Sequence, residues 1–172
     1  MSINVEDGTN VSSADSYISV ADADTYNLAH TADPDWVAAI TAVKEKGLKL
    51  ATQYLDSKYR MRWRGARFNE VQALGWPRTG FYDYDGFEIE GESVPTRLEE
   101  ATVEAAIRVV KGDNLFAVNE NPGLKAHSWG NQTEQESKTY AGGSVADGAK
   151  TYPIIDALLA NLIHSGTLME RG

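Results

Sequence analysis

Apolar residues recur at helical spacing in several parts of the chain, and most of these parts follow a helix-start signal. Residues 19–22 (SVAD) form a capping-box pattern in which Asp22 replaces the usual glutamate. We expect a short helix from this point to about His30, with Ala23 and Tyr26 facing inward.

The strongest helical pattern begins at Asp33-Pro34, an N-cap residue followed by proline at the first helical position. Gly47 falls on the apolar stripe, where glycine costs about 1 kcal/mol relative to alanine. A close crossing with another helix at Gly47 would explain its presence. The predicted stripe comprises Trp36, Ile40, Val43, Gly47, Leu50, Ala51, Tyr54 and Leu55.

Two more helices are expected towards the C-terminus. Residues 94–96 (VPT) begin one of them, and Gly112 follows its end. Acidic residues near its start and basic residues near its end match the helix dipole, and its predicted buried face comprises Leu98, Ala101, Ala105 and Val109. The last helix begins at Pro153 and ends before Gly166, with a wide apolar face made of Ile154, Ile155, Leu158, Leu159, Leu162 and Ile163.

Residues 58–71 show two competing patterns. Arginines at 60, 62 and 64 alternate with Met61, Trp63 and Gly65, and this period of two favours an extended segment. The next stretch, residues 66–74 (ARFNEVQAL), could form one or two helical turns before Trp76-Pro77 interrupts it. The glycines and acids that follow, residues 80–91, predict a hairpin with a short strand.

We therefore expect a mainly α fold, a small bundle of about four helices with a β-hairpin or extended arm. Residues 1–112 would form the helical core with the Trp-Pro-Arg loop and its hairpin, and residues 152–172 the C-terminal helix and tail. Residues 113–151 are rich in glycine and small polar residues, and we expect an extended arm or β-ribbon that is mobile in the free protein.

Composition limits the possible classes of protein. The chain has 172 residues, of which 42% are hydrophobic, enough for a core. No apolar run approaches the length of a membrane span, and the first residues do not suggest a secretory signal. Cysteine is absent, which excludes disulfides and thiol catalysis.

The formal charge is −9, and it is unevenly distributed. Five of the sixteen basic residues, namely Lys58, Arg60, Arg62, Arg64 and Arg67, lie within residues 58–67, so that the rest of the chain carries −14. Such an acidic body should not wrap duplex DNA. We expect the basic patch to pair with acidic residues of an adjacent subunit or of another protein.

The sequence lacks the groups that enzymes and metal sites require. The three histidines stand apart from one another, and there is no phosphate-binding glycine loop or nucleophile elbow. Residues 83–91 (DYDGFEIEG) resemble a calcium loop but have glycine at the wrong position. We therefore expect no catalytic residues, no cofactor and no metal.

The Trp-Pro-Arg sequence at residues 76–78 has two interpretations. Trp76 could bury its ring while Pro77 fixes the turn and Arg78 caps a carbonyl or pairs with an acid. Alternatively, the three residues could form a subunit contact, because Trp and Arg are enriched at interface hot spots. Both can hold if Trp76 lies inside and Arg78 reaches a neighbour.

The chain resembles the phage head-to-tail adaptor (connector, or neck) proteins, a family also labelled DnaT-like single-stranded-DNA-binding protein. The resemblance covers residues 17–113 and resumes at Tyr152, and it departs from the family pattern at Gly47 and Gly75. The matching segments are 17–19 (YIS), 23–26 (ADTY), 51–56 (ATQYLD), 62–65 (RWRG), 72–74 (QAL), 76–78 (WPR), 85–86 (DG), 94–95 (VP) and 152–153 (YP), with Asp156, Leu158, Leu159 and Arg171.

This resemblance implies a homo-oligomeric ring, commonly a dodecamer, in the neck of a virion that is assembled in the host cytoplasm. The ring would lie beneath the portal protein, extend the DNA channel without specific DNA binding, and dock the next neck or tail-completion protein. It also implies that the C-terminal end faces the portal, through Leu159, Leu162, Ile163, Leu168 and Met169. The alternative is a DnaT-like module that binds single-stranded DNA, in which the arginines hold phosphates and Trp63 and Tyr59 stack bases. We favour the adaptor, on the resemblance and on the acidic charge.

Overall fold

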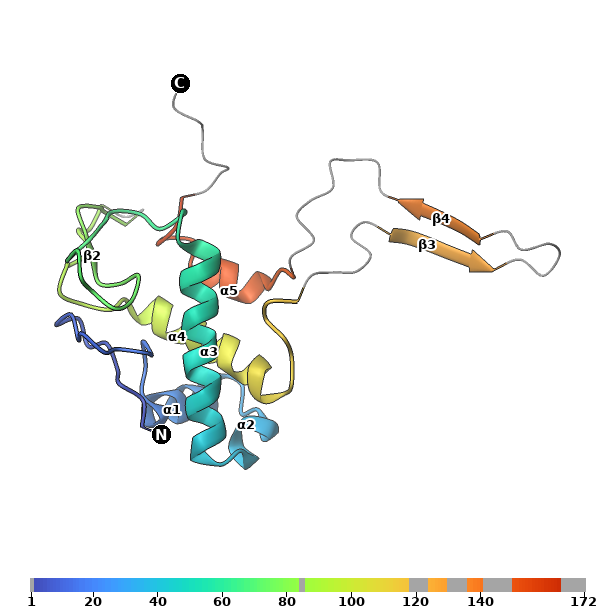
Figure 1. Cartoon of the computed structure of the whole chain (residues 1–172), viewed down its shortest axis with the longest axis horizontal. Helices are drawn as coiled ribbons and strands as arrows, with labels where there is room; N and C mark the ends of the chain where they lie inside the picture. Colours follow the sequence, from blue (N-terminus) through green and yellow to red (C-terminus); the bar gives the residue numbers. More distant parts are fainter. Residues whose placement is uncertain (1, 84–85, 118–123, 130–135, 141–149, 165–172) are drawn as a thin grey trace, which may run out of the picture. The chain divides into compact units, whose positions relative to one another are not determined.

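The computed structural model describes residues 2–83, 86–117, 124–129, 136–140 and 150–164, with backbone only for 124–129 and 136–140. These residues form a mainly α protein with five helices and two small antiparallel sheets, which confirms the predicted fold class (Figure 1). Two units can be distinguished, one comprising Met1–Leu115 with Tyr152–Gly172 and the other Phe116–Thr151. In the second unit, β3 (Leu124–Trp129) pairs with β4 (Glu136–Tyr140).

Helix α1 (Val20–His30) begins as the capping box predicts. The Ser19 side chain accepts a hydrogen bond from the Asp22 backbone N–H at 3.1 Å, which satisfies one of the free donors of the first turn. Ala23 is fully buried, as expected, whereas Tyr26 is half-buried and packs at the edge of the core.

The long helical pattern after Asp33 is divided into two helices. Asp33 caps α2 (Pro34–Ala38), and the chain then adopts an extended conformation at Ala39 and Ile40 before α3 (Thr41–Tyr59) begins. Because the break resets the helical phase, Ile40 and Val43 are 69% and 42% exposed, and their predicted place on the inward stripe was wrong. The buried face of α3 instead comprises Lys44, Gly47, Leu48, Ala51, Thr52, Tyr54, Leu55 and Tyr59.

Helix α4 (Thr96–Val110) crosses α3, and the two helices form the centre of the core (Figure 1). A Cβ atom at Gly47 would lie 3.3 Å from both the Ala106 carbonyl oxygen and the Val110 Cγ2 atom. The predicted close crossing at Gly47 is therefore confirmed. Gly112 has a φ of +87°, as a glycine that ends a helix should.

The last helix is shorter than predicted. Helix α5 extends over Pro153–Leu158, and turns follow it. Ile163 then forms an isolated antiparallel bridge with Trp63, and this contact ends the apolar segment against the core instead of continuing the helix. The expected stop at Gly166 lies outside the described residues.

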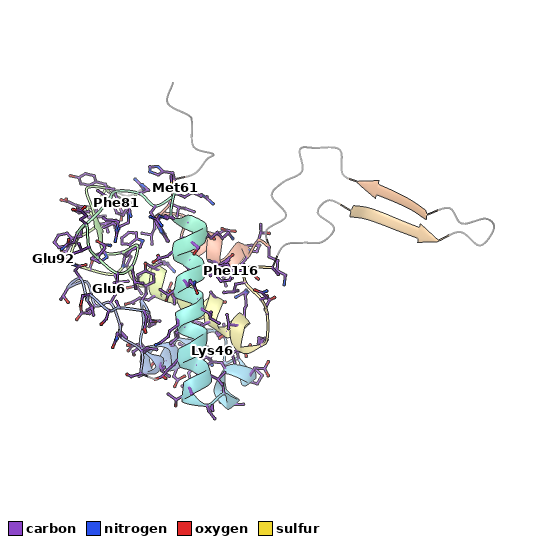
Figure 2. The ribbon with its side chains drawn as sticks, in the orientation of Figure 1. Glu6, Lys46, Met61, Phe81, Glu92 and Phe116 are labelled. Atoms are coloured by element: carbon purple, nitrogen blue, oxygen red, sulfur yellow. The ribbon has the colours of Figure 1, made fainter. Side chains whose placement is uncertain are left out.

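Residues 60–95 connect α3 to α4, and those that the structure describes have little regular structure. Strands β1 (Ala66–Arg67) and β2 (Arg78–Thr79) form a short antiparallel pair, and no helical turn occurs at residues 66–74, so that prediction was wrong. Tyr82 and Glu88 form an antiparallel bridge at the position of the predicted hairpin. Met61 and Phe81 lie near the C-terminal end of α3, whereas Lys46 lies towards its other end (Figure 2).

Candidate nucleic-acid interface

The arginine-rich segment is extended only in its second half. Arg60 is in the right-handed helical conformation, and residues 60–62 form turns that follow α3, so the extended conformation predicted from the alternating arginines is wrong there. From Trp63 onward the chain is extended and pairs with the C-terminal segment. The Arg62 carbonyl accepts a hydrogen bond from the His164 N–H at 2.8 Å, and the Arg64 N–H donates to the Leu162 carbonyl at 3.0 Å. Trp63, between the two arginines, is only 5% exposed. The backbone pairing therefore turns Trp63 into the core and leaves the neighbouring arginines partly exposed.

The arginine side chains of this segment contact rings and backbone carbonyls. The Arg62 guanidinium lies 5.6 Å from the Tyr59 ring centre, and the Arg64 guanidinium lies 5.4 Å from that of Phe81. Arg67 donates a hydrogen bond to the Gln72 carbonyl. Within the part of the chain whose side chains are described, Arg60, Arg62 and Arg67 form no ion pair. Their pairing with acidic residues of an adjacent subunit or of the portal stays a prediction.

The Trp-Pro-Arg loop belongs to the core. The fully buried Trp76 ring lies 5.8 Å from both Trp63 and Phe81, centre to centre, and Pro77 is also buried. Arg78 donates hydrogen bonds to the Arg64, Gly75 and Gly65 carbonyls at 2.7, 3.3 and 2.6 Å. The interpretation as a core anchor is therefore confirmed. The predicted subunit contact through Trp76 and Pro77 is corrected, because neither side chain is presented at the surface.

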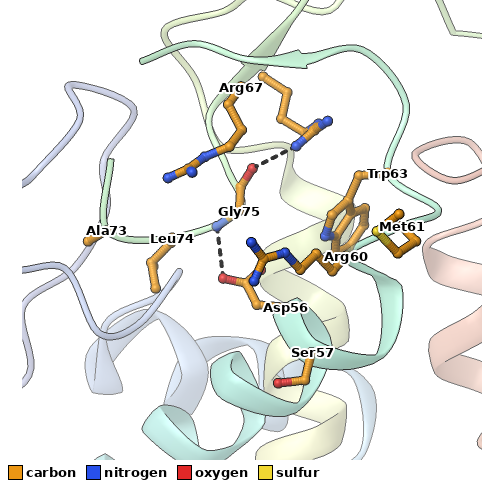
Figure 3. A pocket seen from close by; sticks show the side chains of 10 residues that line it. Asp56, Ser57, Arg60, Met61, Trp63, Arg67, Ala73, Leu74 and Gly75 are labelled. Carbon is orange, nitrogen blue, oxygen red and sulfur yellow. Dashed lines mark hydrogen bonds between the residues drawn. The ribbon is translucent and has the colours of Figure 1, made fainter. Parts of the chain in front are cut away.

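Asp56 fixes this loop onto α3. Its Oδ1 accepts a hydrogen bond from the Tyr17 hydroxyl at 2.5 Å. Its Oδ2 accepts one from the Gly75 N–H at 2.8 Å, which Figure 3 shows. The Tyr17 hydroxyl also accepts a hydrogen bond from the Trp76 N–H at 3.2 Å. Burial raises the pKa of the Asp56 carboxyl, although these hydrogen bonds oppose the shift.

Gly75 is required by this arrangement. A Cβ atom there would lie 2.7 Å from Asp56 Oδ1. In the sequence, Gly75 stands out only as a departure from a family pattern, and no local motif marks Tyr17 or Asp56. These residues are 39 positions apart, so no local pattern could have paired them.

A pocket of about 360 Å³ opens beside this loop (Figure 3). Arg60 reaches it from the end of α3 and Arg67 from β1, so that the two side chains approach from different sides. Its lining residues are Asp56, Ser57, Arg60, Met61, Trp63, Arg67, Ala73, Leu74, Gly75 and Arg78. The lining carries three guanidinium groups and one carboxylate, which makes the pocket suited to an anion.

Three aromatic side chains of the same connection are exposed. Phe68, Tyr82 and Phe87 are 44%, 55% and 71% exposed. A Cβ atom at Gly91 would lie 3.0 Å from Phe68 Cδ2, so the segment that follows the hairpin packs against Phe68. The same connection thus carries both exposed rings and arginines, and single-stranded nucleic acids bind through stacking on rings and through basic groups on phosphates.

The whole chain, residues 1–172, matches a protein family described as "Putative DnaT-like ssDNA binding protein". The chain belongs to this family. No curated protein and no solved structure gave a match. This membership agrees with the DnaT-like part of the resemblance noted above. The role as a phage adaptor stays a prediction.

The three predicted portal-facing residues that the structure describes are not at its surface. Leu159, Leu162 and Ile163 are 0%, 3% and 4% exposed. They belong to the core cluster of their own unit, and this corrects their assignment to a partner contact. Leu168 and Met169 lie outside the described residues, as do most side chains of the predicted arm.

Other kinds of site find little support in the described part of the chain. No group of three or more histidine, cysteine, aspartate or glutamate side chains within it is placed to hold a metal ion. None of the described helices is both long and apolar enough to cross a membrane.

Proposed function

We propose that the protein binds single-stranded DNA across the surface formed by residues 60–91. The observation that carries this proposal is the gathering of Arg60, Arg67 and Arg78 around one pocket, on a chain whose other residues are strongly acidic. The affinity of proteins for DNA comes largely from basic side chains on backbone phosphates.

The exposed rings suit a strand more than a duplex. Phe68, Tyr82 and Phe87 offer surfaces on which unpaired bases can stack, and such stacking is worth roughly 1–3 kcal/mol per base. The positive patch is small and the rest of the chain repels phosphates, so a rigid duplex gains few contacts. A flexible strand can follow the patch. The family description supports this proposal.

Fluorescence anisotropy with a labelled oligothymidine tests it. Arg60→Glu should weaken binding roughly tenfold at physiological salt, because one phosphate contact becomes a repulsion. Lys46→Glu is the matched control, since Lys46 is an exposed cation of α3, the helix that Arg60 follows, and lies outside the pocket. An equal loss of affinity in both variants would contradict the proposal. So would a wild-type protein that does not bind the oligothymidine.

The second candidate is the structural adaptor of a tailed phage. It is favoured by exposed apolar side chains beside the arginines, with Met61 69% and Val71 79% exposed, because such mixed surfaces suit protein partners. In this role the chain would form a ring, contact the portal and a downstream neck protein, and reside in the virion neck. It would have no catalytic activity.

Size measurement of the purified protein, alone and mixed with portal rings, separates the two candidates. Assembly on portal rings without affinity for oligonucleotides would support the adaptor. Arg62→Glu with Arg64→Glu should then abolish assembly and leave the subunit folded. Tight binding of single-stranded DNA, without binding to portal rings, would support the first proposal.

A further inference from the structure

The pocket beside Gly75 offers more positive charge than one backbone phosphate requires. Arg60, Arg67 and Arg78 supply three formal positive charges, and Asp56 is the one carboxylate in the lining. Both Asp56 oxygens already accept hydrogen bonds, from the Tyr17 hydroxyl and the Gly75 N–H. Asp56 forms no ion pair with the three arginines. Three guanidinium groups and one carboxylate give the pocket a formal excess of two positive charges.

The three guanidinium groups have different amounts of freedom. Arg78 is fixed by three backbone carbonyls, and Arg67 uses one nitrogen on the Gln72 carbonyl. The Arg60 side chain is exposed and makes no hydrogen bond to the described residues. Arg78 therefore sets a permanent positive field at the pocket wall, whereas Arg60 can close on a ligand and form a bidentate contact.

Charge and shape together select among phosphates. An internal phosphodiester carries one negative charge, and a phosphate monoester carries close to two at pH 7. An internal phosphodiester must also bring a sugar on each side to the mouth of the pocket. A strand end brings only one sugar, so that its phosphate can enter a hollow of about 360 Å³.

We propose that this pocket binds a phosphate monoester at the end of a DNA strand. The inference rests on the proposed strand-binding function and names the part of the strand that the pocket takes. The remaining nucleotides would extend over the exposed rings of Phe68, Tyr82 and Phe87.

The test compares labelled oligothymidines of one length that carry a 5′-phosphate, a 3′-phosphate or hydroxyls at both ends. We expect one of the phosphorylated strands to bind about tenfold more tightly than the hydroxyl strand. Arg60→Gln should reduce this preference to less than twofold. Lys46→Gln, which removes the same charge from the other end of α3, should leave it unchanged.

Two further arms identify the source of the phosphate and separate this inference from the function on which it rests. Thymidine 5′-monophosphate should compete with the phosphorylated strand more strongly than inorganic phosphate at equal concentration. The indole N–H of Trp63, in the pocket wall, should shift in nuclear magnetic resonance spectra, and that of Trp36, which donates to Asp24 at 2.8 Å, should not.

The outcomes are distinguishable. Strand binding that depends on Arg60 but not on the terminal phosphate would overturn the pocket inference and leave the proposed function standing. Saturable binding of the monophosphate at the pocket, without affinity for any strand, would overturn the proposed function and keep the pocket as a phosphate site.

Discussion

Basic side chains along α3 and basic side chains just beyond its C-terminal end have different partners. In the N-terminal half of α3, Lys44 lies 2.8 Å from Asp24 and Lys49 lies 2.6 Å from Asp15, so these two cations are neutralised by carboxylates. Beyond its C-terminal end, Arg62 lies over an aromatic ring and Arg67 donates to a carbonyl. Lys44 and Lys49 are thus paired within the fold, as is Lys58 in the last turn, which lies 3.9 Å from Asp156. Arg60, just beyond the helix, forms no ion pair among the described residues and is available to an anion.

The two ends of α3 also differ in how their structure is held. Helices α1 and α2 begin at capping side chains and pack on α4, so local signals and helix packing determine the first end. The loop at the second end is held by buried aromatics and by the hydrogen bonds of Asp56. A site can form there because irregular backbone leaves room for a pocket that close-packed helices would fill.

The largest effect is expected from removing the aromatic anchor of the loop. Trp76→Ala should lower the free energy of unfolding by about 3–5 kcal/mol, because a fully buried ring leaves a cavity. Chemical denaturation measures this. Trp36→Ala at the helical end is the matched comparison, and a loss below about 1 kcal/mol for Trp76 alone would show that the loop is not part of the core.

Alkaline pH should destabilise the whole unit. Burial raises the pKa of Tyr17, Tyr54 and Tyr59 above the usual tyrosine value of about 10, and it raises the pKa of Tyr26 to about 12. Since the unfolded chain ionises first, the stability that these groups contribute is complete below about pH 10 and is lost as the pH rises further.

Circular dichroism across pH 8–12 measures this loss. Tyr17→Phe should make the alkaline decline shallower, with Tyr82→Phe at an exposed position as the control. A stability that stays constant to pH 12 would contradict the prediction.

Any side chain at Gly47, where α3 and α4 cross, should lower the free energy of unfolding. Gly47→Leu is expected to lower stability by about 1–3 kcal/mol, because the new atoms meet the Ala106 carbonyl. Thermal denaturation measures the change. Lys46→Leu, at the adjacent exposed position, should be nearly neutral, and an equally neutral Gly47→Leu would refute the close crossing.

The smallest effect is expected at the cap of α1. Ser19→Ala should cost about 1 kcal/mol, since the Asp22 N–H loses its acceptor. Urea denaturation can resolve this difference. Ser19→Asp keeps an acceptor at the cap and should restore most of the loss; failure of this rescue would argue that Ser19 acts in another way.

Sequence alone determined the features that depend on neighbouring residues. The starts at Ser19, Asp33-Pro34 and Pro95 and the glycine end at Gly112 follow from capping and from proline geometry, and these act within a few residues. The expected crossing at Gly47 also came from sequence, because a glycine on an apolar stripe implies close approach.

Tertiary structure decided what lies against each of these segments. The sequence predicts an apolar face at Leu159, Leu162 and Ile163, but it does not determine whether the core of the same chain or a partner covers that face. In the structure, the core of the same chain covers it. The pocket joins Asp56, Arg67 and Gly75 from separate segments, through contacts that have no sequence period. Burial and long-range hydrogen bonds depend on how the whole chain folds back, so only the folded arrangement could reveal the site.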